Sequence, residues 1–109
     1  SSSSDARARR YRGVDAADYR YQMLAATDGD LERLRKSLAV LNPFGVRNSY
    51  NDTPLHLAAV RGHVDACRML LLFEPSLVHA VNSGKNTALH LAASTGWVDV
   101  VRFLLDAGA

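Results

Sequence analysis

The stretch that decides the fold reads Asn51-Asp52-Thr53-Pro54-Leu55-His56-Leu57-Ala58-Ala59. It returns about 34 residues later as Lys85-Asn86-Thr87-Ala88-Leu89-His90-Leu91-Ala92-Ala93. The agreement continues downstream, where Gly62 corresponds to Gly96 and Leu70-Leu71 corresponds to Leu104-Leu105. A period of this length is typical of stacked helical units, each of which buries its apolar face against the next. The sequence therefore predicts a repeat protein.

A weaker copy precedes these two. Leu24-Ala25-Ala26 is followed by Gly29 and then by Leu31, Leu34 and Leu38 at the same offsets, but the Thr-x-Leu-His opening is missing. Terminal units of a repeat stack are usually atypical, because one side faces solvent rather than a neighbour. We therefore expect three repeats, the first of which is a degenerate cap.

Each copy is expected to form two short helices. Thr53 is a suitable N-cap, and Pro54 suits the first helical position because its missing N–H would have no partner there. Gly62 and Gly96 interrupt the chain before the second helix. The second helix then carries an apolar stripe at helical spacing, formed by Val64, Cys67, Leu70 and Leu71.

The alanine pairs recur at 25–26, 58–59 and 92–93, which predicts that the first helices of neighbouring repeats approach closely. The connecting segments, 41–52 and 74–86, are rich in the turn formers Asn, Pro, Gly and Ser. We expect them to project as loops or hairpins.

Thr53-Pro54-Leu55-His56-Leu57-Ala58-Ala59, with Gly62-His63, Leu70-Leu71 and the second copy from Thr87, resembles the ankyrin repeat signature. The resemblance covers about residues 18–109 and implies an all-α solenoid of stacked helix-turn-helix units with projecting hairpins. Three positions depart from the pattern: Trp97 replaces a His, Lys85 stands where a turn Gly is usual, and Glu74-Pro75 replaces a Gly-containing helix end.

The expected organisation has four parts. Residues 1–14 form a basic tail that we expect to be mobile, and helix begins near residues 15–18. The degenerate cap then covers residues 15–47, the second repeat 48–81, and the third 82–109, whose C-terminal side is incomplete. More repeats are expected to follow. An apolar end face near Val98, Val101 and Leu105 is accordingly predicted to self-associate.

Composition narrows the class of function. The hydrophobic content of 48% is ordinary for a globular chain, and a net charge of +2 falls far short of a phosphate-binding surface. The single cysteine, Cys67, cannot form an intrachain disulfide, which fits an intracellular compartment. No apolar run is long enough to cross a membrane, so we expect no membrane association.

We expect no catalytic residue, cofactor or metal. His56 and His90 lack other ligands at suitable spacing, and the resemblance implies that they brace neighbouring repeats. Cys67 aligns with Val101 on the core stripe, which favours a buried apolar role. Acid–base pairs three residues apart are expected to be weak surface ion pairs, at Glu32/Arg35, Asp65/Arg68 and Asp99/Arg102.

Two aromatic residues are candidates for binding a partner. Trp97 either covers a gap in the stack or offers a rigid anchor, and the first interpretation is favoured because Trp is usually partly buried. Tyr50 lies at the tip of a connector, so it is the better exposed candidate.

The predicted function is a protein-protein interaction scaffold, since the resemblance implies that variable side chains on hairpin tips and first-helix ends contact a protein partner. Two alternatives stay open: the basic tail binds nucleic acid or an anionic surface, or the chain is a non-catalytic module of a larger enzyme. The predicted contact residues are Thr27, Asp28, Ser49, Tyr50, Asp52, Val60, Arg61, Ser83, Gly84, Asn86, Ser94, Thr95 and Trp97.

Overall fold

The computed structural model describes residues 16–108, with side chains described from residue 19 onward. The prediction of a mobile tail over residues 1–14 lies outside this range. Within it the chain forms α2 (Ala16–Asp28), α3 (Leu31–Leu38), α4 (Pro54–Val60), α5 (Val64–Phe73), α6 (Ala88–Thr95) and α7 (Val98–Asp106), with short 3-10 helices η1 (Pro43–Gly45) and η2 (Pro75–His79).

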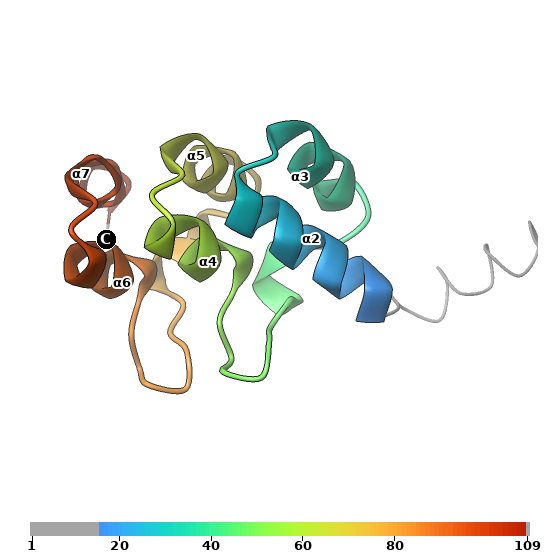
Figure 1. The fold of residues 1–109 in the computed structure, drawn as a ribbon, viewed down its shortest axis with the longest axis horizontal. Helices are drawn as coiled ribbons and strands as arrows, with labels where there is room; N and C mark the ends of the chain where they lie inside the picture. Colours follow the sequence, from blue (N-terminus) through green and yellow to red (C-terminus); the bar gives the residue numbers. More distant parts are fainter. Residues whose placement is uncertain (1–15, 109) are drawn as a thin grey trace, which may run out of the picture.

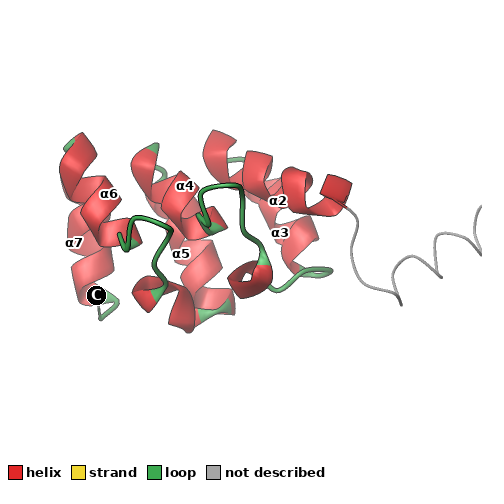
Figure 2. Ribbon diagram, turned by 90° about the horizontal axis from the view of Figure 1, so that it is seen from below, coloured by secondary structure: helices red, strands yellow, loops and turns green. Residues whose placement is uncertain are grey.

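The helices form two layers. The first helices of the three pairs, α2, α4 and α6, lie side by side in one layer, and α3, α5 and α7 form the other (Figure 1). The connecting segments leave the second layer, pass below the first, and project as two parallel hairpins (Figures 1 and 2). The described residues contain no strand, so the prediction of an all-α stack is confirmed.

The helices begin where side chains can satisfy their free backbone N–H groups. The Thr53 hydroxyl accepts from the backbone N–H of His56 at 3.3 Å, and Thr87 does the same for His90 at 3.4 Å. The first repeat has Arg20 at the corresponding position, so it lacks this cap. Its helix α2 is already formed at Ala16, the first residue that the structure describes.

Small residues allow the first helices to approach each other. Ala26, Ala58, Ala59 and Ala92 are completely buried between α2, α4 and α6. The second layer turns its apolar stripe toward the first layer, and completely buried large side chains also come from Leu55 on α4 and Leu77 on η2. Completely buried leucines recur at equivalent positions in the second layer, namely Leu34, Leu70 and Leu104.

The connectors are more ordered than loops. The prediction of loops or hairpins is incomplete, because η1 and η2 occupy the first part of each connector. Pro43 and Pro75 start these turns, since a fixed φ suits a tight helical turn. In the hairpins, Asn51 and Lys85 take the left-handed conformation with φ of 64° and 60°. The turn therefore uses Lys85, and Gly84 beside it does not have a positive φ.

Gly62 illustrates how closely consecutive repeats stack. Its φ is +80°, and a Cβ added there would lie 2.6 Å from the ring of Trp97 in the next repeat. Gly96 has nearly the same φ, +82°, yet a Cβ there would meet nothing within 4 Å. Both glycines therefore adopt a positive φ, but only Gly62 lies close to another side chain, that of Trp97.

Substitution of these glycines separates the two effects. Gly96→Ala should lower the free energy of unfolding by about 1 kcal/mol, which is the cost of a side chain in the left-handed region. Gly62→Ala should cost about 2 to 4 kcal/mol, because the new methyl also displaces the Trp97 ring. Urea unfolding of both variants measures the difference, and equal losses would contradict this account of the stacking.

Candidate protein-binding surface

His56 joins the second repeat to the third. Its Nδ1 lies 2.8 Å from the Thr53 hydroxyl and 3.1 Å from the Thr53 backbone nitrogen, which donates to it. Its Nε2 lies 2.7 Å from the carbonyl oxygen of Asn86 and therefore donates to it. Since Nδ1 accepts from a backbone N–H, the neutral Nε2–H tautomer satisfies every contact. The imidazole thus completes a helix cap and holds the next hairpin at the same time.

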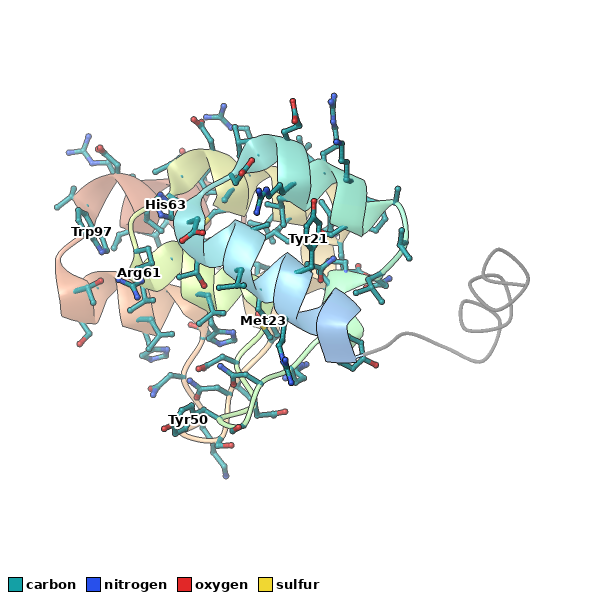
Figure 3. The ribbon with its side chains drawn as sticks, turned by 45° about the vertical axis from the view of Figure 1, so that its right-hand side comes forward. Tyr21, Met23, Tyr50, Arg61, His63 and Trp97 are labelled. Atoms are coloured by element: carbon teal, nitrogen blue, oxygen red, sulfur yellow. The ribbon has the colours of Figure 1, made fainter. Side chains whose placement is uncertain are left out.

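A second brace runs in the opposite direction, from each second helix back to the preceding repeat. The Nε2 atom of His63 lies 2.8 Å from the carbonyl oxygen of Thr27, and the indole Nε1–H of Trp97 donates to the carbonyl of Val60 at 2.8 Å. These residues occupy equivalent positions and lie side by side along the boundary between the two layers (Figure 3). Trp97 thus has the structural role favoured above, although its side chain is still 44% exposed.

Asparagine side chains shape the two hairpins. The Oδ1 atom of Asn48 accepts from the backbone N–H groups of Tyr50 and Asp52, both at 2.9 Å. Asn82 repeats the pattern with Gly84 at 2.9 Å and Asn86 at 3.0 Å. Neither asparagine was predicted as a structural residue, although their recurrence with the repeat period is a signal that identifies them.

The hairpins also bond to one another. The backbone N–H of Ser83 donates to the Tyr50 carbonyl at 2.9 Å, and the Asn82 amide donates to the Asp52 carboxylate at 2.7 Å. Arg47 spans the pair, because its Nη1 donates to the carbonyls of Asn51 and Val81. Hydrogen bonds therefore join the two hairpin tips into one surface below the first helices, which we call the hairpin ledge.

The predicted contact residues fall into two groups. Ser49, Tyr50, Ser83 and Gly84 are exposed on the hairpins, while Asp28, Arg61, Ser94 and Thr95 are exposed at the first-helix ends; Thr27 and Val60 are partly buried there. Asp52 and Asn86 are partly buried and hydrogen-bonded within the hairpins. Their contact with a partner remains a prediction.

The first helices also carry an apolar stripe, which was not predicted. Leu24, Leu57 and Leu91 occupy equivalent positions on the three first helices, and none of them is fully buried. Leu24 is 60% exposed. Beside it, Met23 stands where the later repeats have His56 and His90, and it packs with Leu41 and Val46 in a separate small core. The cap thus replaces a polar brace with apolar packing.

The residues considered for catalysis have structural environments. Cys67 is completely buried, and burial raises the pKa of its thiol to about 12, which removes the thiolate that nucleophilic catalysis needs. The described residues contain no group of His, Cys, Asp and Glu that could hold a metal ion.

Of the expected surface ion pairs, only Asp65–Arg68 is present within residues 19–108, at 3.8 Å. The predictions of ion pairs at Glu32/Arg35 and Asp99/Arg102 are wrong, because neither pair forms in the described structure. Asp30–Arg33 pairs instead, at 3.4 Å, because Asp30 is fixed as the N-cap of α3. Solvated side chains elsewhere gain little from pairing. The arginines of the N-terminal tail lie outside the described residues.

The fold and the recurring braces define a solenoid of stacked helix-turn-helix repeats. The family model for ankyrin repeats, in three copies, matches residues 22–109. The chain therefore belongs to the ankyrin repeat family, whose domains generally bind other proteins and are typically non-catalytic. Comparison with curated proteins finds none that matches. No helix among the described residues has both the length and the apolar character to cross a membrane.

Burial makes the brace at His56 sensitive to pH. Desolvation lowers the pKa of His56 below its ordinary value of 6.5, reinforced by the charge of Arg47 and opposed by the Asn86 carbonyl and Asp52. The folded chain therefore takes up this proton at lower pH than the unfolded chain. Its contribution to stability is complete above pH 6.5 and decreases as the pH falls toward the folded-state pKa.

We expect the wild-type protein to lose stability between about pH 7.5 and about pH 5.5, in part through His56. His56→Ala should cost about 1 to 3 kcal/mol at the higher pH, because the partly buried Asn86 carbonyl loses its donor, and should flatten the pH dependence. Denaturant unfolding across this range measures both. The matched variant His90→Ala removes the equivalent cap residue at an exposed position, so it separates the loss of a helix cap from the loss of the buried brace. A slope unchanged in His56→Ala would refute the assignment.

Proposed function

We propose that this chain is a protein-binding scaffold that presents its hairpin ledge and first-helix ends to a protein partner. The observation that carries the proposal is the state of Tyr50. Its side chain is 72% exposed, while its backbone N–H and carbonyl are both hydrogen-bonded, to Asn48 and Ser83. A large aromatic group on a fixed backbone loses little entropy on binding, and such residues often dominate interface energies.

Arg61 extends the same surface. It is the C-cap residue of α4, at the opposite end of this helix from the hairpin that carries Tyr50 (Figure 3). Its side chain is exposed, and the first-helix ends at Asp28 and Thr95 flank it on the neighbouring repeats. The surface therefore continues across all three repeats.

Affinity capture with three baits tests this surface. Wild-type protein, the double variant Tyr50→Ala/Arg61→Ala, and a control variant Glu32→Ala/Arg102→Ala on the second layer are compared by quantitative mass spectrometry. Proteins retained by the wild type and the control should be depleted at least about tenfold on the double variant, since two contact residues are removed. Circular dichroism confirms that all three are folded. Equal retention by all baits would show that this is the wrong face.

We also propose that the end face formed by α6 and α7 self-associates with a second copy of the chain. Leu105 is 55% exposed, whereas its counterpart Leu71 is 8% exposed under the third repeat. Val98 is 59% exposed, and His90 is exposed where His56 is completely buried. The end face thus displays the surface that the second repeat uses for stacking, and two copies could cover it in a symmetric contact.

Sedimentation velocity at increasing protein concentration tests the self-association. The wild-type mass should rise with concentration, and Leu105→Glu should remain monomeric because a charge then replaces an apolar contact. Arg102→Ala on the same helix serves as the control. A wild-type mass that is independent of concentration would exclude the contact.

A further inference from the structure

A groove lies between α2, α4 and the first hairpin. It joins the apolar stripe of the first helices (Leu24, Leu57 and Leu91) to the hairpin ledge. It has a volume of about 360 Å³. Figure 3 shows Met23 on the side of α2 that faces this hairpin. The residues that line the groove include Tyr19, Met23, Leu24, Arg47, Asn48 and Leu57.

The floor of the groove is apolar and supported from below. Met23 is 9% exposed and packs on Leu41 and Val46, with Leu57 against the same small core. Leu24 extends the floor toward solvent. A methionine beside branched side chains adapts its shape readily to an inserted group. The floor therefore suits one bulky apolar side chain.

One wall of the groove carries a fixed positive charge. The Nε of Arg47 donates to the Phe44 carbonyl at 3.2 Å, and its Nη1 donates to Asn51 at 3.3 Å and Val81 at 3.2 Å. The guanidinium carbon lies 5.3 Å from the centroid of the Phe44 ring. These contacts hold the side chain in place, and all of its acceptors are neutral. No carboxylate within residues 19–108 forms an ion pair with it.

Asp52, the acidic residue of the same hairpin, forms hydrogen bonds with other groups. The two carboxylate oxygens of Asp52 accept from the amides of Asn48 and Asn82, at 3.3 and 2.7 Å. Arg20 also lines the groove and adds a second positive charge. A fixed cation beside an apolar floor matches a carboxylate placed next to an apolar side chain.

We propose that this groove binds a partner segment in which a bulky apolar residue is adjacent to Asp or Glu. The apolar side chain contacts Met23, Leu24 and Leu57, and the carboxylate lies near Arg47. This inference rests on the proposed protein-binding function and specifies the chemistry of the partner at one part of the surface.

Three capped peptides test the inference on the isotope-labelled full chain by NMR titration. Asp-Asp-Leu-Leu-Asp-Asp should shift amide signals of α2, α4 and the first hairpin. Lys-Lys-Leu-Leu-Lys-Lys should not bind there because its charge is wrong, and Asp-Asp-Ser-Ser-Asp-Asp should bind at least about fivefold more weakly because it lacks the apolar group. Equal binding of the two acidic peptides would overturn the proposal in favour of a general polyanion site, which includes nucleic acid. Absence of shifts with all three would also overturn it.

Variants localise the effect without disturbing the core. Leu24→Ser, at a 60% exposed position, should raise the dissociation constant of the acidic leucine peptide at least about fivefold. Leu72→Ser, at an 80% exposed position on α5, is the matched control and should leave it unchanged. An equal effect of both variants would overturn the groove as the site. If Tyr50→Ala/Arg61→Ala still abolishes partner capture while the peptides fail, only this inference falls and the scaffold function stands.

Discussion

Close approach of the first helices is the constraint on which the rest of the structure depends. Completely buried alanines between α2, α4 and α6 set the spacing of the repeats, and at that spacing the polar groups of one repeat lie within hydrogen-bond distance of the next. His56 bonds forward to Asn86, while His63 and Trp97 bond backward to Thr27 and Val60. A larger residue in place of any of these alanines would separate both braces, so packing and hydrogen bonding support each other.

The same spacing determines the surface available to a partner. Because consecutive hairpins lie side by side, Asn82 reaches Asp52 and Arg47 reaches Val81, and the two tips form one bonded ledge. The backbone and the polar side chains near the turns maintain the shape of this ledge, while the side chain of Tyr50 faces solvent. Shape and recognition therefore come from different atoms of the same short segment.

Much of this architecture could be predicted from the sequence, because the repeated motif carries its own local chemistry. Thr53 and Thr87 identify helix starts, and Gly62 and Gly96 identify the breaks. The alanine pairs identify the contact between first helices except at Ala93, which is exposed on the last repeat. The role of Trp97 was harder to predict. An indole and an imidazole differ in size and in the number of ring nitrogens, yet each has an N–H at the reach required by the carbonyl of the preceding repeat. The partial exposure of Leu57 was not predicted either, since a leucine inside a repeated motif gives no indication of which side of a short helix faces the hairpin.

Trp97 has a practical consequence. It is the only tryptophan of the chain, and its indole is hydrogen-bonded across the boundary between the second and third repeats. Two of the three described tyrosines, Tyr19 and Tyr21, lie at the opposite end, on α2, and the third, Tyr50, lies on the first hairpin. Excitation of the indole alone therefore reports on the docking of the last repeat, whereas tyrosine emission is weighted toward the cap. Intrinsic fluorescence can thus distinguish fraying from the two ends of the stack without an added label.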